Sequence, residues 1–227
     1  MAPSPFVVAI DGPAGSGKST IARLLARKIG ASYLDTGALY RAIAFYLDGR
    51  SVPPEEGEPL RCALAELTVS LRGERVFLGD EDVTDRIRTP RVDSIVSRYA
   101  ALGPVRESLL DLQRSQSRLG PLVADGRDMG TVVFPEADVK IFLSASPEER
   151  ARRRWRELVD RGETLTCEEV LFQVIRRDRI DSDRTLAPLR EAEGAFSVDT
   201  TDLSVEEVLS HLCDLMKPDL SGRLGDV

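Results

Sequence analysis

Short apolar runs that alternate with helical stretches are the main pattern along this chain. Between the first two runs, apolar residues at positions 21, 24, 25 and 29 have the spacing of one helix face. The predicted strands are residues 6–10, a short run that ends before Asp35, and residues 122–124, 139–143 and 195–198. This alternation predicts an α/β fold of three layers, in which helices cover both faces of a five-stranded parallel sheet.

Two short sequences in the second half of the chain mark helix starts. Ser146 is followed by Pro147 and Glu149, the order of a serine cap, a proline in the first turn and a glutamate at the third helical position. Ser204 and Glu207 repeat the cap and the glutamate. Helices are therefore predicted to begin after residues 146 and 204.

The middle of the chain departs from the alternation of strands and helices. Apolar residues alternate on both sides of a turn at residues 72–74, which predicts a small antiparallel hairpin, and two helical stretches follow at 90–101 and 104–119. We expect one domain with its core at residues 5–67 and 119–217, and an inserted α+β subdomain at about 68–118. The tail at 218–227 lacks periodicity and is expected to be frayed.

The most specific motif follows the first strand. Residues 12–19 read GPAGSGKS, which fills every fixed position of the G-x-x-x-x-G-K-[ST] phosphate-binding pattern between a strand and a helix. Its glycines let successive N–H groups face an anion, the lysine adds a charge for the β- and γ-phosphates, and the serine hydroxyl can bind Mg²⁺. The residues expected to hold a nucleotide are Gly12, Pro13, Ala14, Gly15, Ser16, Gly17, Lys18, Ser19 and Thr20.

Acidic residues stand where the predicted strands end. Asp125 follows the third strand within Asp-Gly-Arg-Asp, so it can hold Mg²⁺ across the site from Ser19, while Arg127 and Asp128 point into the same site. A plain Asp-Gly turn is the alternative. A turn alone does not require the additional arginine and aspartate, which favours the functional interpretation.

Arginine supplies most of the positive charge, since only four of the 31 basic residues are lysines. Guanidinium groups bind phosphate in a planar, bidentate way, so arginines grouped at one site indicate phosphate binding. Thr36 is expected to cap a helix that carries Arg41 one turn later, and an ordinary helix start explains this pair equally well.

Two further groups of arginines lie in the second half. Arginines at 150, 152, 153, 154 and 156 precede Gly162, which could form a mobile lid at 150–166 over transferring phosphates; a solvated helix face is the alternative. Arg177, Asp181 and Arg184 have the spacing of one helix face, and surface ion pairs would also explain them.

Composition excludes several classes of function. The net charge of −7 argues against a general nucleic-acid binder, and three scattered cysteines indicate neither a zinc site nor a disulfide framework. His211 is the only histidine, which excludes histidine-based triads and metal sites. With no signal peptide and no run of membrane-spanning length, we expect a cytoplasmic monomer that binds neither nucleic acid nor membranes.

Taken together, the motifs resemble bacterial cytidylate kinases, which are P-loop nucleoside-monophosphate kinases. The segments that carry the resemblance include IDGPAGSGKST, YLDTGALYR, DVTDRIR, ADGRDMGTVVFPEADVKIFL and RRDRIDSDR. The likeness extends from residue 6 to about 216, and ADGRDMGTVVFP is its most specific part. The resemblance implies transfer of the ATP γ-phosphoryl group to CMP or dCMP with Mg²⁺, and it makes the inserted segment a monophosphate-binding subdomain.

The resemblance also implies roles for individual residues. It places Thr36, Arg41, Arg127 and Arg184 around the CMP phosphate, Ser97, Arg106 and Asp128 at cytosine, and Arg177 and Asp181 at the ribose. The implied catalytic residues are Lys18, Arg127, Arg184, Arg150 and Arg154, with Ser19 and Asp125 as metal ligands. Many relatives have glycine after the loop lysine, so Ser19 is a departure that favours a hydroxyl contact to Mg²⁺.

Two alternatives to this interpretation remain. One is a P-loop kinase with a different small acceptor. The other is a nucleotide-dependent switch, although no lysine here lies in the [NT]-K-x-D motif that GTPase switches normally carry.

Overall fold

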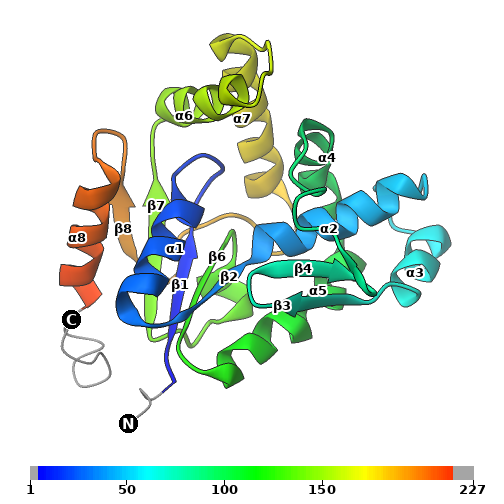
Figure 1. Ribbon diagram of the computed structural model, residues 1–227, viewed down its shortest axis with the longest axis horizontal. Helices are drawn as coiled ribbons and strands as arrows, with labels where there is room; N and C mark the ends of the chain where they lie inside the picture. Colours follow the sequence, from blue (N-terminus) through cyan, green and yellow to red (C-terminus); the bar gives the residue numbers. More distant parts are fainter. Residues whose placement is uncertain (1–4, 217–227) are drawn as a thin grey trace.

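A five-stranded parallel sheet forms the centre of the molecule in the computed structural model, which describes residues 5–216 (Figure 1). Its strands are β1 (Val7–Asp11), β2 (Ser32–Asp35), β6 (Leu122–Gly126), β7 (Val139–Ser144) and β8 (Phe196–Asp199), in the order β2-β6-β1-β7-β8. All neighbouring strands pair in parallel, which confirms the predicted sheet. The register aligns Asp35 with Asp125 and Asp11 with Gly126, so these residues lie at one edge of the sheet.

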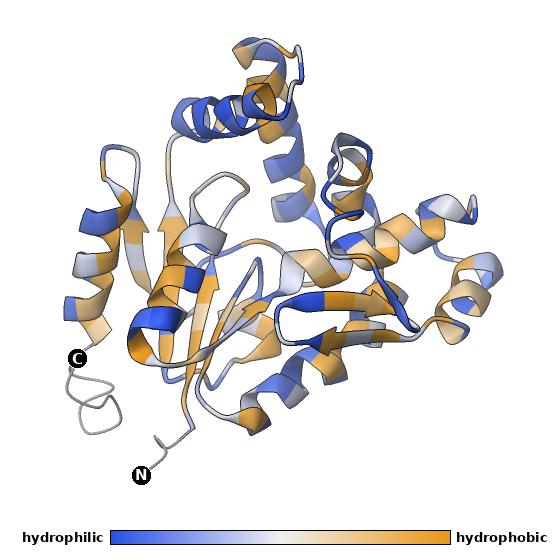
Figure 2. Cartoon of the chain, viewed as in Figure 1, coloured by the Kyte–Doolittle hydropathy of each residue, from blue (hydrophilic) through white to orange (hydrophobic). Residues whose placement is uncertain are grey.

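Helices cover both faces of this sheet, as the sequence predicts. On one face, α1 (Lys18–Ile29) and α8 (Val205–Met216) pack against Val8 and Ile10 of β1. On the other face, α2 (Thr36–Gly49) packs against Ala9 and Ala124. Figure 2 shows hydrophobic residues concentrated where these layers meet. Consecutive β1 residues are buried on opposite faces because side chains alternate along a strand.

The segment between α2 and β6 contains more structure than the hairpin and two helices predicted there. It comprises α3 (Glu58–Ala65), β3 (Val69–Arg72), β4 (Arg75–Leu78), β5 (Glu81–Asp82), α4 (Pro90–Ala100), α5 (Gly103–Ser115) and a 3₁₀ turn (Gln116–Leu119). Strands β3, β4 and β5 form an antiparallel sheet. The predicted hairpin is therefore confirmed as β3 and β4, and the third strand, β5, was not predicted.

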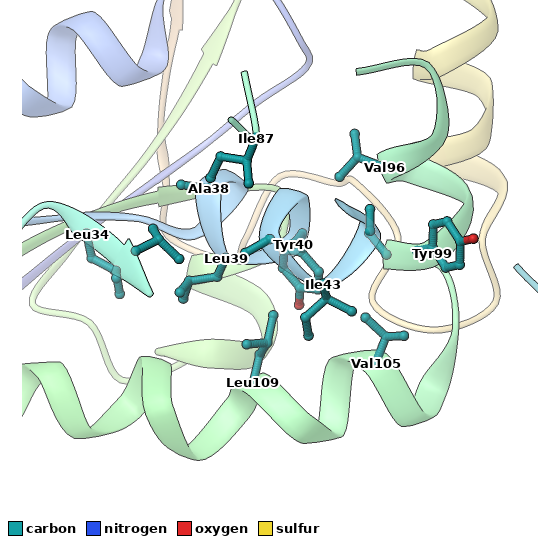
Figure 3. Close-up of a cluster of buried hydrophobic side chains, with 14 of the residues drawn as sticks. Leu34, Ala38, Leu39, Tyr40, Ile43, Ile87, Val96, Tyr99, Val105 and Leu109 are labelled. Carbon is teal, nitrogen blue, oxygen red and sulfur yellow. The ribbon is translucent and has the colours of Figure 1, made fainter. Parts of the chain in front are cut away.

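The inserted segment shares its hydrophobic core with the central sheet. Leu39 and Ile43 of α2 lie in one cluster with Ile87, Val96 and Leu109 from the insert (Figure 3). These side chains are almost completely buried, and each such residue typically contributes about 1.5–3 kcal/mol through burial. Helix α2 therefore joins the insert to the sheet.

The hairpin of α6 (Pro147–Asp160) and α7 (Cys167–Asp183) stands above the carboxyl edge of the sheet in Figure 1. Both predicted serine caps are confirmed, because Ser146 Oγ and Ser204 Oγ each accept the N–H of the residue three positions later at 3.2 Å. The α6–α7 hairpin has a small hydrophobic cluster of its own, built on Ala151, Leu158, Val170 and Val174. No helix within residues 5–216 is both long and apolar enough to cross a membrane. The tail expected to fray, 218–227, lies outside the described residues.

Candidate functional site

The loop between β1 and α1 has a backbone conformation that requires glycine. Gly12 has φ 148°, and a Cβ there would lie 1.9 Å from the carbonyl oxygen of Leu143. Gly17 has φ 86° and is the N-cap of α1, so no side chain covers the first-turn amides of that helix. Amides at the positive end of a helix favour an anion, which fits the predicted phosphate loop.

Lys18 is the first residue of α1, and its side chain folds back onto this loop. Its side chain is almost completely buried, and Nζ donates hydrogen bonds to the Pro13 carbonyl at 2.6 Å and to Ser16 Oγ at 3.4 Å. Burial holds the pKa of Lys18 well below its usual value, and the positive charge of Arg127 lowers it further while Asp125 opposes the shift. An anion bound here would favour the charged ammonium, because it would compensate both effects.

Ser19 and Asp125, the two predicted metal ligands, are in contact. Ser19 Oγ donates to Asp125 Oδ2 at 2.9 Å, and the Tyr33 hydroxyl donates to Asp125 Oδ1 at 2.8 Å. Burial, followed by the nearby charge of Asp35, raises the pKa of Asp125. Sequence reasoning missed Tyr33, whose position beside Asp125 depends on the pairing of β2 with β6.

These oxygens suit Mg²⁺, which takes one or two protein ligands and completes its octahedral shell with waters and substrate phosphates. Ser19 and Asp125 lie beside the phosphate loop, where such phosphates would be held. Within residues 5–216, no three His, Cys, Asp or Glu side chains cluster in a way that could hold a metal alone. The residues therefore fit Mg²⁺ that arrives with a nucleotide.

Thr36 does not cap α2, so that prediction is wrong. The N-cap is Asp35, whose Oδ1 accepts the Ala38 N–H at 2.9 Å. Thr36 is the first helical residue, and its buried hydroxyl donates to the backbone carbonyl of Asp125 at 2.6 Å. Thr36 thus fixes the start of α2 against the end of β6, next to the predicted metal ligand.

Arg41 extends from α2 toward α4. Its Nε and Nη2 both donate to Oδ1 of Asp93, at 3.0 and 2.9 Å. The other oxygen of Asp93 accepts from Nη2 of Arg154 on α6. A single carboxylate therefore joins two of the predicted phosphate-binding arginines.

The predicted base-reading pair is formed. Asp128 is 1% exposed and accepts a hydrogen bond from Arg106 Nη2 on α5. Arg106 Nη1 also donates to the Ala100 carbonyl at 3.1 Å, and Arg184 Nη2 lies 3.6 Å from Asp128 Oδ1. Ser97 is buried on α4, and within the described chain its hydroxyl makes no hydrogen bond to Arg106 or Asp128.

Asp11 holds the turn that follows Asp128. Its two oxygens accept the N–H groups of Met129 and Gly130, both at 2.8 Å, at the start of a π-helical turn (Met129–Val133). Burial raises the pKa of Asp11 to about 6, although these two hydrogen bonds oppose the shift. The sequence places Asp11 at a strand end but gives no sign of this contact, which spans more than a hundred residues.

Arg127, Asp181 and Arg177 form a third group. Arg127 Nε donates to Asp181 Oδ2 at 2.8 Å. Burial lowers the pKa of Arg177 to about 10, with the charge of Arg127 as the next cause, and Arg177 Nε has no hydrogen-bond partner in the described structure. Arg177 is therefore a partly buried cation whose charge an incoming anion would stabilise.

Arg184 lies beyond the helix on which the sequence places it. Helix α7 ends at Asp183, and Arg184 follows in an extended conformation with ψ 138°. Its Nε donates to the carbonyl of Ala187 at 2.6 Å. The extended backbone turns Arg184 away from the face of Arg177 and Asp181 and toward Asp128.

The arginine run on α6 divides into two sets. Arg152 and Arg156 are exposed, as the solvated-face alternative predicts. Arg150 is 4% exposed and bonds to the Ala14 carbonyl of the loop at 3.2 Å and to Asp178 of α7 at 2.6 Å.

Arg153, which sequence reasoning did not single out, also reaches the phosphate loop region. Its Nη1 donates to Thr200 Oγ1 at 3.0 Å, and that hydroxyl donates to the Ser16 carbonyl at 3.2 Å. Helix α6 therefore contacts the loop through Arg150 directly and through Arg153 by way of Thr200.

Comparison with known proteins agrees with this geometry. The family model described as cytidylate kinase matches residues 8–218. A cytidylate kinase of Carboxydothermus hydrogenoformans is 47% identical over 224 residues, which cover 97% of this chain and 99% of that protein. A cytidylate kinase of Thermosipho melanesiensis is 46% identical over 213 residues, with coverage of 94% and 97%.

Among solved structures, an uncharacterized protein from Eubacterium ventriosum has a similar fold. The TM-score is 0.51, and the match covers 95% of this chain and 99% of that one. The sequences are only 11% identical, so the likeness concerns the fold alone.

Proposed function

The chain belongs to the cytidylate kinase family, and from that premise we propose that it transfers the γ-phosphoryl group of ATP to CMP or dCMP, giving ADP and CDP or dCDP. One observation supports a two-nucleotide site above all. The charge of Arg127 lowers the pKa of both Lys18 and Arg177, and Arg41 also lowers that of Arg177. Cations from the loop and from the opposite half lie within electrostatic range of one another, and such an array suits the triphosphate of ATP and the single phosphate of the acceptor, which would meet between them.

The donor half consists of the loop, Lys18 and the pair of Ser19 and Asp125. The loop amides and Lys18 would hold the ATP phosphates. Ser19 and Asp125 would hold Mg²⁺, which would neutralise part of the negative charge of the phosphates. Tyr33 would orient Asp125 by its hydrogen bond to the second carboxylate oxygen.

The acceptor half would hold the CMP phosphate through Arg41, Arg127 and Arg184, with Thr36 at the edge of this group. Arg150 and Arg154 would add charge from the α6–α7 hairpin, and Arg177 with Asp181 would contact the ribose. These groups would align the acceptor oxygen with the transferring phosphorus, which is the main requirement of phosphoryl transfer. A phosphate oxygen is already ionised, so this reaction needs no general base.

Cytosine would be read by the pair of Arg106 and Asp128, with Ser97 nearby on α4. A carboxylate can accept a hydrogen bond from the cytosine amino group, which uracil lacks. A base that left this buried pair unsatisfied would bind poorly, because unpaired buried polar groups are costly. The pair thus provides a physical basis for preferring CMP over UMP.

A panel of acceptors tests the proposal directly. Purified protein with Mg·ATP should phosphorylate CMP and dCMP faster than UMP or AMP, as measured by ADP release and by product chromatography. A Lys18→Ala variant purified in the same way controls for contaminating kinases. Inactivity toward CMP and dCMP would overturn the proposal and favour a different acceptor.

We also propose that the protein is a cytoplasmic monomer. Light scattering on the protein eluting from a size-exclusion column should give a mass close to 25.0 kDa. A mass of twice that value would contradict the monomer.

A further inference from the structure

Asp93 is an acidic side chain that lies among the cations proposed to bind phosphate. It projects from α4 and pairs with Arg41 of α2 and with Arg154 of α6, one oxygen to each. Its side chain is 15% exposed, and those of Arg41 and Arg154 are 19% and 26% exposed. This partly buried carboxylate therefore bridges the acceptor half and the α6–α7 hairpin.

The guanidinium nitrogens of Arg41 that bind Asp93 are nitrogens that a phosphate could also bind, which argues for competition between the two anions. Nε and Nη2 form one edge of the guanidinium, and both donate to Asp93. Its Nη1 lies over the first turn of α2, because a Cβ on Gly37 would come within 2.9 Å of that atom. The edge bound to Asp93 is therefore one of the two edges at which a guanidinium can bind phosphate in a bidentate way.

The charge balance points the same way. Burial raises the pKa of Asp93, but the charges of Arg41, Arg154 and Arg177 outweigh it and hold the pKa below its usual value. The ionised carboxylate gives these arginines the negative charge that a phosphate would otherwise supply. A phosphate dianion that approached Arg41 would meet this like charge.

We propose that Asp93 is an internal competitor of the acceptor phosphate, a positioning residue that occupies Arg41 and Arg154 in the free protein and ties α6 to α4 until phosphate replaces it. The proposal rests on the acceptor site described above. It goes beyond that site, because Asp93 weakens acceptor binding instead of contributing to it. No bond is made or broken; one anionic partner of two arginines is exchanged for another.

The test compares Asp93→Asn with a matched control on the same two helices. Asp48 of α2 pairs with Arg91 of α4 through Nε at 3.0 Å and Nη2 at 2.6 Å, on the exposed surface. Asp48→Asn therefore removes a more exposed ion pair between the same two helices, whose two hydrogen bonds do not involve α6. Wild type and both variants are titrated calorimetrically with CMP, cytidine and inorganic phosphate.

Asp93→Asn should bind CMP about tenfold more tightly than wild type, since a like charge next to the phosphate is removed. Its affinity for cytidine, which has no phosphate, should change by less than about twofold, and Asp48→Asn should match wild type for every ligand. Unchanged or weaker CMP binding in Asp93→Asn would overturn the proposal. An equal change for CMP and cytidine, or the same change in Asp48→Asn, would also overturn it.

Hydrogen exchange of the free proteins tests the tie to α6 without any ligand. Amides of residues 147–160 should exchange about threefold faster in Asp93→Asn than in wild type or Asp48→Asn. Unchanged exchange there contradicts the proposal. Should Asp93→Asn fail to fold, Arg154→Gln breaks the α6 side of the bridge and should give the same increase. Glu157→Gln, which removes only the ion pair of Arg154 with Glu157 inside α6, is its control and should exchange like wild type.

Failure of the proposed function gives a different pattern. If neither wild type nor Asp93→Asn binds CMP, the acceptor assignment is wrong. The inorganic phosphate titration and the exchange rates then still decide whether Asp93 competes for these arginines, with tighter phosphate binding and faster exchange in Asp93→Asn as the required result.

Discussion

The phosphate loop is built from backbone, whereas the opposite half of the site is built from side chains that other side chains hold in place. The loop is one continuous segment, residues 12–17, and its shape depends on glycines. The acceptor half combines residues of α2, α4, α5, α7 and the segment after β6 through the pairs Arg41–Asp93, Arg106–Asp128 and Arg127–Asp181. The loop should therefore tolerate little change of backbone, and the acceptor half should respond mainly to changes of charge.

The largest expected effect is that of Gly12→Ala, which tests the backbone half. A Cβ at this position would lie 1.9 Å from a backbone carbonyl, and φ is 148°. The free energy of unfolding should fall by more than about 3 kcal/mol. Urea unfolding followed by circular dichroism measures it.

Gly73→Ala is the control for that substitution. Gly73 has φ 62° in the turn between β3 and β4, and a Cβ there would meet nothing within 4 Å. Its cost should be the backbone strain alone, about 1–2 kcal/mol. Equal losses in the two variants would show that the contact with the Leu143 carbonyl is unimportant.

The next effect concerns the side-chain half. Arg106→Ala should lower the ratio of kcat/KM for CMP over UMP by about 10- to 100-fold, because the buried Asp128 would lose its strongest partner. The KM for ATP should change far less. Arg98→Ala, an exposed arginine on α4, serves as the control. A CMP-to-UMP ratio of kcat/KM that stays at the wild-type value would show that Arg106 has no role in base recognition.

This difference between the halves also explains what could be predicted from sequence. The loop and the five strands are local patterns, and both could be predicted. Helix α3 was missed because residues 58–65 hold only two buried residues, Leu60 and Ala63, which is too few to show a helical period. Strand β5 was missed because a strand of two residues shows no alternation. The cap of α2 was placed one residue late, since both Asp35 and Thr36 can accept an amide and only the folded backbone selects Asp35.

Most of the candidate side chains were identified, but their partners were not. Spacing alone does not separate Arg150 and Arg154 from Arg152, because all lie on one helix and the distinction depends on how α6 packs. Only the family resemblance selected Arg150 and Arg154, which make contacts toward the site. Tyr33, Asp93 and Asp11 act across sheet or helix contacts distant in sequence, and composition and spacing carry no signal of these contacts.

A pH titration examines the residue that links the two halves, Asp11. Its pKa is about 6 in the folded protein against 3.8 as the reference, so the folded state binds this proton more tightly than the unfolded state. Its contribution to stability is therefore greatest below about pH 4 and is lost as the pH rises to about 6. The change amounts to roughly 3 kcal/mol, from about 1.4 kcal/mol per pKa unit.

Asp11→Asn isolates this contribution. Urea unfolding at several pH values measures the free energy of unfolding of both proteins. Between pH 4 and 6, the free energy of unfolding of wild type should fall relative to that of the variant. Above pH 7, the difference between the two proteins should be constant. A difference that is constant with pH would show that Asp11 ionises normally, and the link between β1 and the turn after Asp128 would then not depend on its protonation.

The smallest effect should come from Ser19, which lies in the first turn of α1 directly after the loop and whose side chain is proposed to bind metal. Ser19→Ala should raise the Mg²⁺ concentration needed for half-maximal activity by about threefold, with kcat nearly unchanged, because a water can replace one hydroxyl in a shell that also contains phosphate oxygens. Binding of ATP without Mg²⁺, measured by calorimetry, should match wild type, since the loop amides and Lys18 hold the phosphates. Asp125 would lose one hydrogen-bond donor but keep Tyr33. If metal-free ATP binding fell as much as Mg²⁺ dependence rose, the hydroxyl would support the loop itself, and the contrast between a backbone half and a side-chain half would fail at this position.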